Sequence, residues 1–153
     1  MTHTVFVLHA LATWWMTGLI WLIQVVHYPL FSRVGVEAFD AYHRLHVAWI
    51  TPVVVPAMLV ELAGAVWLLA DRPDWMPPWA AAVGLGLVGV AWLSTFFLSV
   101  PAHSALGAGL DVAVVDRLVR TNLVRTLAWT LRAALVGALL ARALGGSVSG
   151  ALR

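Results

Sequence analysis

Four long apolar segments dominate the hydrophobic pattern of this chain. They cover residues 4–31, 47–70, 79–100 and 122–144. Each has the roughly 20 residues that a helix needs to cross about 30 Å of hydrocarbon, and none has the polar face that a soluble helix presents to water. The pattern predicts an all-α, integral membrane four-helix bundle that forms a single transmembrane domain over residues 1–153.

Two of the connections between these segments carry helical patterns of their own. In the first connection, aromatic and imidazole side chains recur at three- and four-residue spacings: Phe39, Tyr42, His43 and His46. On a helix, this spacing forms one continuous face. The third connection has an amphipathic stretch at 111–120, after Pro101. We therefore predict short amphipathic helices in the first and third loops, the first of them lying on the mouth of the bundle or running into the second span.

The overall composition indicates the same class of protein. Hydrophobic residues make up 62% of the chain and charged residues only 10%, with a mean hydropathy of +0.92, whereas about a quarter of the residues in soluble proteins are charged. We expect the lipid bilayer to be the main partner and a bacterial inner membrane to be the location. The pI near 9.9 accompanies a net charge of only +2, so no nucleic-acid binding is predicted.

The number of spans determines which connections share a side of the membrane. With four spans, both termini lie with the second loop on one side, here called the terminal face, and the first and third loops lie on the other, here called the loop face. The loop face carries more arginines than the terminal face: Arg33, Arg44, Arg117, Arg120 and Arg125 against Arg72, Arg142 and Arg153. The positive-inside rule therefore predicts that the first and third loops are cytoplasmic.

Four of the six histidines lie near the span ends at the loop face: His27, His43, His46 and His103. Histidine is the commonest metal ligand and titrates near neutral pH, so such a group could bind a metal ion or move protons. Because the chain has no cysteine, a bound metal would be copper, iron or zinc with nitrogen and oxygen ligands. The alternative for His43 and His46 is contact with water or lipid headgroups.

Glu61 and Arg132 are charged residues inside the second and fourth predicted spans. A charge at the bilayer centre costs about 2.5 kcal/mol or more, so each needs a partner, and span positions allow the two to lie at the same depth. One interpretation is a structural ion pair that fixes the register of two helices. The other is that Glu61 accepts a proton or supplies an oxygen ligand beneath the histidines, because Pro52 and Pro56 tilt it into reach.

Asn122 and Arg125 share a helix face where the fourth span begins, at the loop face. The arginine could bind an anionic or phenolate oxygen, and the asparagine could form a hydrogen bond with the same ligand. Alternatively, Arg125 reaches a lipid phosphate. The sequence has no Ser-His-Asp order, no glycine-rich phosphate loop and no HExxH motif, which argues against hydrolases and nucleotide-driven proteins.

The chain also resembles the anthrone oxygenase-like family of small four-span membrane proteins. The motifs that carry the resemblance are Tyr28-Pro29-Leu30, Val100-Pro101 with Leu106, and Asn122 with Arg125-Thr126. The resemblance covers most of the chain by layout and implies oxidation of an anthrone to an anthraquinone by dioxygen. The residues that match the family's motif positions are Pro101, Asn122, Arg125 and Thr126. The chain departs from the family at His103, where asparagine is frequent, and at Thr121, where tryptophan is common.

These observations lead to one hypothesis and one alternative. The hypothesis is a membrane-embedded oxidoreductase or oxygenase that acts on a lipophilic phenolic, quinol or anthrone-like small molecule. Its candidate catalytic residues are His43, His46, Glu61, Asn122 and Arg125, and its candidate metal ligands are His27, His43, His46 and His103. The alternative is a non-catalytic protein that binds or transports a metal ion, haem or quinone. Either could act as a homo-oligomer, since small residues could pack helices within or between protomers at Gly84, Gly86 and Gly89.

Overall fold

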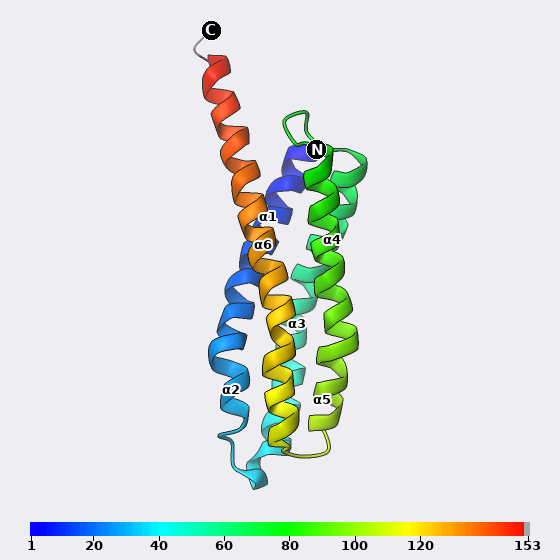
Figure 1. Cartoon of the computed structure of the whole chain (residues 1–153), viewed down its shortest axis with the longest axis vertical. Helices are drawn as coiled ribbons and strands as arrows, with labels where there is room; N and C mark the ends of the chain where they lie inside the picture. Colours follow the sequence, from blue (N-terminus) through cyan, green and yellow to red (C-terminus); the bar gives the residue numbers. More distant parts are fainter. Residues whose placement is uncertain (152–153) are drawn as a thin grey trace.

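The computed structural model describes residues 1–151, and within that range the chain folds into helices joined by short connections (Figure 1). The elements in chain order are α1 (Thr2–Leu22), η1 (Ile23–His27), α2 (Tyr28–Phe31), α3 (Val36–Ala70), α4 (Pro78–Ser94), η2 (Thr95–Ser99), α5 (Val100–Leu106) and α6 (Val112–Ala151). The two η elements are π-helical segments. Residues 152 and 153, which the predicted single domain includes, lie outside the described residues.

Consecutive elements join into four rods that are long and apolar enough to cross a membrane: Thr2–Phe31, Val36–Ala70, Pro78–Leu106 and Val112–Gly145. They contain the four predicted spans and extend beyond them. Figure 1 shows both termini at one end of the bundle together with the loop at 71–77, and the other two connections at the opposite end. This is the arrangement that an even number of spans predicts. Which face is cytoplasmic stays a prediction.

The first and third loops do not contain separate short helices. The stretches predicted to form them are the first turns of α3 and of α6, so the helix of the first loop runs into the second span, which was one of its two predicted arrangements. The helices continue because no glycine or proline interrupts residues 36–46 or 112–120. The start of α6 is capped by Asp111, whose Oδ1 accepts hydrogen bonds from the backbone N–H groups of Ala113 and Val114 at 2.8 and 3.2 Å. The histidines of the first loop therefore stand on the same continuous helix as the second span.

Two π-helical turns lie in the half of the bundle near the loop face. η1 precedes Pro29 and η2 precedes Pro101 by the same number of residues. Proline lacks an N–H group, so a carbonyl one turn earlier loses its α-helical partner, and a π turn accommodates that loss. The extra residue in each turn rotates the side chains that follow by about 100° relative to a regular helix. The π turns thus set which way Tyr28 and His103 face.

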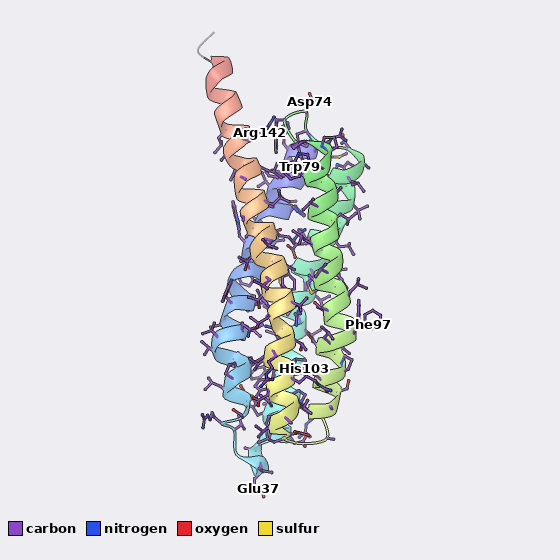
Figure 2. The ribbon with its side chains drawn as sticks, viewed as in Figure 1. Glu37, Asp74, Trp79, Phe97, His103 and Arg142 are labelled. Atoms are coloured by element: carbon purple, nitrogen blue, oxygen red, sulfur yellow. The ribbon has the colours of Figure 1, made fainter. Side chains whose placement is uncertain are left out.

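The outside of the bundle is apolar over most of its length. Only 22 to 44% of the most apolar window of each rod is buried, and Trp49 and Phe97 are 69% and 72% exposed. Figure 2 shows Phe97 pointing away from the bundle. A soluble monomer rarely exposes so much contiguous apolar surface. The four rods therefore suggest a membrane protein, and their exterior is compatible with contact with lipid.

Candidate functional site

The four histidines predicted to share the loop face come together in one group, here called the histidine cluster: His27, His43, His46 and His103. His27 Nε2 lies 2.8 Å from His46 Nδ1, and His43 Nε2 lies 3.1 Å from His103 Nδ1. The rings of His46 and His103 stack with centroids 5.3 Å apart, which joins the two pairs. Asp74 marks the terminal face in Figure 2, and His103 lies in the opposite half of the bundle.

Packing against aromatic side chains holds these imidazoles in place. Phe31 contacts His43 and His46 edge to face, with ring centroids 6.0 and 5.0 Å apart. Phe39 stacks on His43 at 5.7 Å. Both phenylalanines are fully buried in the larger apolar core of the bundle. The core that folds this end of the molecule therefore also orients the histidine cluster.

Tyr28 belongs to the site, although the sequence singled it out only as part of a family motif. Its side chain is 3% exposed, and its hydroxyl lies 2.9 Å from His103 Nε2. Because His103 also contacts His43 through Nδ1, the three side chains form a continuous hydrogen-bonded chain from α2 through α5 to α3. The π turn just before Tyr28 rotates it onto this face, and α-helical spacing from the sequence does not reveal that rotation.

A groove of about 630 Å³ runs between α3 and α5 beside the histidine cluster. Its lining is His43, Arg44, His46, Val47, Ala48, Ile50, Thr51, Val100, His103, Ser104 and Gly107. Most of these side chains are apolar or small, and the polar ones are three imidazoles with Arg44, Thr51 and Ser104. Sites for small molecules have volumes of about 300–1,000 Å³ and combine an apolar lining with a few polar groups. In size and lining, the groove therefore suits a lipophilic molecule with one polar group.

Arg125 is buried next to this group rather than extended toward the membrane surface. It is 5% exposed, and its Nη1 donates a hydrogen bond of 2.9 Å to Ser99 Oγ. Its guanidinium lies over the ring of Trp129 at 5.4 Å. Its positive charge acts on both Tyr28 and His103. The alternative in which Arg125 reaches a lipid phosphate does not fit this burial, and Arg125 stands with the histidine cluster as predicted.

Asn122 occupies a neighbouring polar group instead of the histidine cluster. Its Nδ2 donates to Gln24 Oε1 at 2.9 Å, and Thr126 donates to the same oxygen at 3.3 Å. Gln24 Nε2 in turn donates to the backbone oxygen of Val119 at 3.1 Å. These bonds link η1 to α6 at the depth of the π turn. They give Asn122 a positioning role in the packing of two helices, which the pairing with Arg125 in the sequence did not indicate.

Three buried side-chain atoms lack a hydrogen-bond partner within residues 1–151: His46 Nε2, Asn122 Oδ1 and Arg125 Nε. Buried polar atoms are nearly always satisfied, so each such atom calls for a ligand, an ion or a water molecule. His46 also lines the groove. Its Nε2 is the nitrogen of the histidine cluster that is buried without a hydrogen-bond partner in the described residues.

Glu61 and Arg132 form a buried ion pair deep in the bundle. Arg132 Nε lies 3.3 Å from Glu61 Oε1, and both side chains are at most 3% exposed. The indole N–H of Trp129 donates to Glu61 Oε2 at 2.7 Å, and Arg132 also donates to the backbone oxygen of Gly84. The pair therefore connects α3, α4 and α6. This geometry favours the structural ion pair over the alternative role of Glu61 at the histidines.

The separation along α3 leads to the same conclusion. Glu61 follows His46 by about 15 residues on one helix, which is roughly 22 Å at the α-helical rise of about 1.5 Å per residue. The structure therefore does not bring Glu61 together with the histidine cluster, even though Pro52 and Pro56 lie between the two in α3. The helix continues through both prolines.

His9 completes the buried ion-pair centre and was not singled out from the sequence. Its Nε2 lies 3.2 Å from Arg132 Nη2, and its Nδ1 lies 3.2 Å from the backbone oxygen of Glu61. The carbonyl can only accept, so Nδ1 carries the proton and Nε2 accepts from the guanidinium. His9 is thus a neutral histidine that positions Arg132. A lone histidine in an apolar segment gives no periodic signal of such a role.

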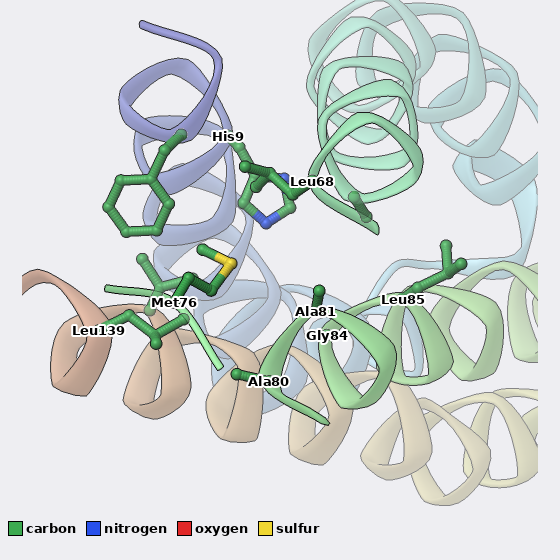
Figure 3. A pocket seen from close by; sticks show the side chains of 11 residues that line it. His9, Leu68, Met76, Ala80, Ala81, Gly84, Leu85 and Leu139 are labelled. Atoms are coloured by element: carbon green, nitrogen blue, oxygen red, sulfur yellow. The ribbon is translucent and has the colours of Figure 1, made fainter. Parts of the chain in front are cut away.

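A small cavity adjoins His9 near the terminal face (Figure 3). Its volume is about 20 Å³, which is room for roughly one water molecule. Apart from His9, the side chains that line it are apolar, and Figure 3 shows Leu68, Met76 and Leu139 around the imidazole. A buried water needs two to four polar partners, and both nitrogens of His9 already have theirs. The cavity therefore offers no second polar site.

Gly64 allows the close approach of His9 to α3, and replacing it tests this packing. A Cβ atom at Gly64 would lie 2.8 Å from His9 Nδ1 and 2.9 Å from His9 Cβ. Gly64→Ala is therefore expected to destabilise the bundle by about 1–3 kcal/mol, measured as the free energy of unfolding in mixed micelles. Gly18→Ala is the matched control, because a Cβ there meets nothing within 4 Å. Equal stabilities of the two variants would contradict the packing described.

The histidine cluster is organised by hydrogen bonds between imidazoles. Within residues 1–151, no group of three or more histidine or carboxylate side chains is arranged to hold a metal ion. Copper, iron or zinc at His27, His43, His46 and His103 stays a prediction. No protein-family model, curated protein or solved structure matches this chain. The resemblance to anthrone oxygenase-like proteins therefore also stays a prediction.

Proposed function

We propose that this chain is an integral membrane oxidoreductase that oxidises a lipophilic phenol, quinol or anthrone with dioxygen, with the substrate bound in the groove between α3 and α5. The proposed location is a bacterial inner membrane, and the substrate enters the groove from the bilayer. The observation that carries this proposal is the groove itself. It combines an apolar lining with three imidazoles and lies on the lipid-exposed side of α3, next to the half-exposed side chain of Val47.

His46 is the base in this proposal. Its Nδ1 contacts His27 Nε2 at 2.8 Å, and we assign the proton of this bond to His46, so that its Nε2 keeps a free lone pair. Because this nitrogen is buried in the resting structure, the His46 ring has to turn toward the groove before a phenolic O–H there can donate to its lone pair. His27 then stabilises the imidazolium that forms. This is the arrangement of a general base oriented by a hydrogen-bond partner. His43 is engaged with His103 and is less suited to this step.

Arg125 supplies the positive charge that the deprotonated substrate requires. Deprotonating a phenol or an acidic C–H in a medium of low dielectric constant is costly unless the oxyanion has a counter-charge. In the described residues, Arg44 and Arg132 form ion pairs with carboxylates, whereas Arg125 donates a hydrogen bond to the neutral Ser99. Its charge is therefore available for an anion formed near Tyr28 and His103.

The reaction balances without another reductant or oxidant. One anthrone and one dioxygen give one anthraquinone and one water, and the carbon that loses its two hydrogens becomes a carbonyl. With a quinol, one molecule and one dioxygen give one quinone and one hydrogen peroxide. In each case, the protein has to bind the substrate, remove its first proton and exclude bulk water. The apolar groove binds the substrate and excludes bulk water. His46 removes the proton, and Arg125 supplies the counter-charge for the anion.

A second candidate is a non-catalytic protein that binds or carries a metal ion, haem or quinone. The unpartnered Nε2 of His46 favours it, because that atom is equally suited to bind a metal. Metal analysis of the purified protein separates the two candidates. Stoichiometric copper, iron or zinc that is lost in a His43→Ala/His46→Ala double variant supports the metal site, and metal-free protein with full oxidation activity contradicts it.

Filling the groove tests where the substrate binds. Val47→Trp places a large ring in the groove and is expected to raise the KM for a hydrophobic phenol about tenfold, which corresponds to about 1.4 kcal/mol of lost binding. Val55→Trp is the matched control, because Val55 lies on the same helix with an exposed fraction of 41% against 40% for Val47 and is not part of the groove lining. Equal KM values for the two variants would place the substrate elsewhere.

A further inference from the structure

Tyr28 stands at the inner end of a hydrogen-bonded chain that leads out to the loop face. The hydroxyl of Tyr28 lies 2.9 Å from His103 Nε2, and His103 Nδ1 lies 3.1 Å from His43 Nε2. Tyr28 is 3% exposed. His43 stands near the start of α3, where the electrostatic field of Asp40 acts on it. The hydrogen-bonded chain therefore runs from a buried phenol to an imidazole on which the charge of the exposed Asp40 acts.

The two hydrogen bonds of this chain can both be assigned with the donor on the inner side and the acceptor on the outer side. If the phenol donates to His103 Nε2, then His103 carries its own proton on Nδ1 and donates it to His43 Nε2. His43 then carries its proton on Nδ1. Each of the two hydrogen bonds has one donor and one acceptor in this arrangement, so one proton can move outward at each bond. The hydrogen-bonded chain can therefore pass the phenolic proton outward, and no extra positive charge stays on His103 beside Arg125.

We propose that Tyr28 is a redox-active tyrosine that gives up an electron to an oxidant in the groove while its proton leaves through His103 and His43. His103 lines the groove, so a single imidazole separates the phenol from a molecule bound there. The nearby charge of Arg125 opposes a cationic phenol radical. Loss of the electron must therefore be coupled to loss of the proton, and His103 is the acceptor in hydrogen-bond contact.

The step balances with a dioxygen-derived radical as the oxidant. A hydroperoxyl radical takes one electron from Tyr28 and one proton from solvent and becomes hydrogen peroxide. The O–H bond of Tyr28 breaks, its proton moves to His103 Nε2, the Nδ1 proton of His103 moves to His43 Nε2, and His43 releases a proton at the loop face. Tyr28 becomes a neutral tyrosyl radical, which a phenol or quinol in the groove reduces by giving up a hydrogen atom.

This inference rests on the proposed function only because that function supplies the natural oxidant of Tyr28. Its test requires neither a substrate nor catalytic turnover. The full-length protein, grown with ring-deuterated tyrosine, is oxidised in lipid nanodiscs by a flash-generated ruthenium(III) trisbipyridyl complex. Electron paramagnetic resonance then detects a tyrosyl radical whose spectrum is narrowed by deuterium. The chain has only two tyrosines, so Tyr28→Phe is expected to abolish the signal, and the matched variant Tyr42→Phe is expected to keep it.

A second variant tests the proton acceptor and separates a chemical role from a structural one. His103→Ala is expected to slow formation of the radical by about tenfold or more, and free imidazole is expected to restore the rate, because the vacated space opens into the groove. A radical that persists in Tyr28→Phe, no tyrosyl radical in the unmodified chain, or an unchanged rate in His103→Ala would overturn the proposal. If Tyr28→Phe does not fold, the rate of radical formation in His103→Ala, measured with and without free imidazole, tests the proposal instead.

The two proposals fail independently. Substrate oxidation without a flash-induced tyrosyl radical overturns the redox role of Tyr28 and leaves the proposed function standing. A tyrosyl radical on Tyr28 without oxidation of any phenol or quinol supports the relay and contradicts the proposed function.

Discussion

Glu61→Leu is expected to destabilise the bundle by about 3–5 kcal/mol, because it leaves the buried guanidinium of Arg132 without its counter-charge. The change also removes the acceptor of the Trp129 indole N–H, which adds a second unsatisfied group. Both partners are almost fully buried, so water does not reach the charge that remains. The measurement is the free energy of unfolding in mixed micelles, followed by circular dichroism during titration with sodium dodecyl sulfate.

Two further variants test whether the loss of stability comes from an unpaired charge inside the bundle. The Glu61→Leu/Arg132→Leu double variant is expected to be more stable than Glu61→Leu alone, since no unpaired charge is left inside the bundle. Asp40→Asn breaks the exposed pair with Arg44 and is expected to cost only about 0.3–0.5 kcal/mol. If Glu61→Leu cost no more than Asp40→Asn, Glu61 would not hold the structural ion pair that the geometry indicates.

His46→Ala is expected to lower the rate of substrate oxidation by about 10²–10⁴-fold, the usual contribution of a general base. The loss should appear mainly in kcat, because the apolar lining that binds the substrate is retained. The measurement is the initial rate of oxygen consumption with a saturating hydrophobic phenol or quinol, using protein reconstituted in lipid nanodiscs.

His3→Ala is the matched control for this prediction. His3 is exposed and lies near the N-terminus, at the terminal face, so the variant removes an imidazole without touching the groove. Its activity is expected to equal that of the unmodified chain. A His46→Ala variant that keeps full activity and a normal fold would show that another group takes the proton, and His43 is the next candidate.

The bundle and the histidine cluster were predictable from the sequence because both follow from length and order alone. A run of about 20 apolar residues is long enough to span a bilayer as a helix. Once four such runs are placed in order, His27, His46 and His103 must fall at the same end. The match in depth of Glu61 and Arg132 is also confirmed, because charges deep in a bundle need partners.

The features that the sequence did not reveal depend on local departures from regular helix geometry and on side-chain packing. Tyr28 faces His103 because a π turn rotates it, and no α-helical spacing predicts that rotation. The sequence left open whether the helix of the first loop lies on the mouth of the bundle or runs into the second span, and it runs into the span because nothing breaks α3 there. His9 was missed because its partners, the carbonyl of Glu61 and the guanidinium of Arg132, come from other helices.

Oxygen uptake by the purified protein in lipid nanodiscs tests whether it oxidises a lipophilic substrate with dioxygen. A panel of hydrophobic phenols, quinols and anthrones is added to the unmodified chain, and uptake is compared with the amount of oxidised product. We expect saturable uptake with at least one member, one dioxygen consumed for each anthraquinone or quinone formed, and loss of this uptake in His46→Ala. Absence of uptake with every member, while the same molecules still bind in the groove, would contradict it and identify a binding or carrier protein instead.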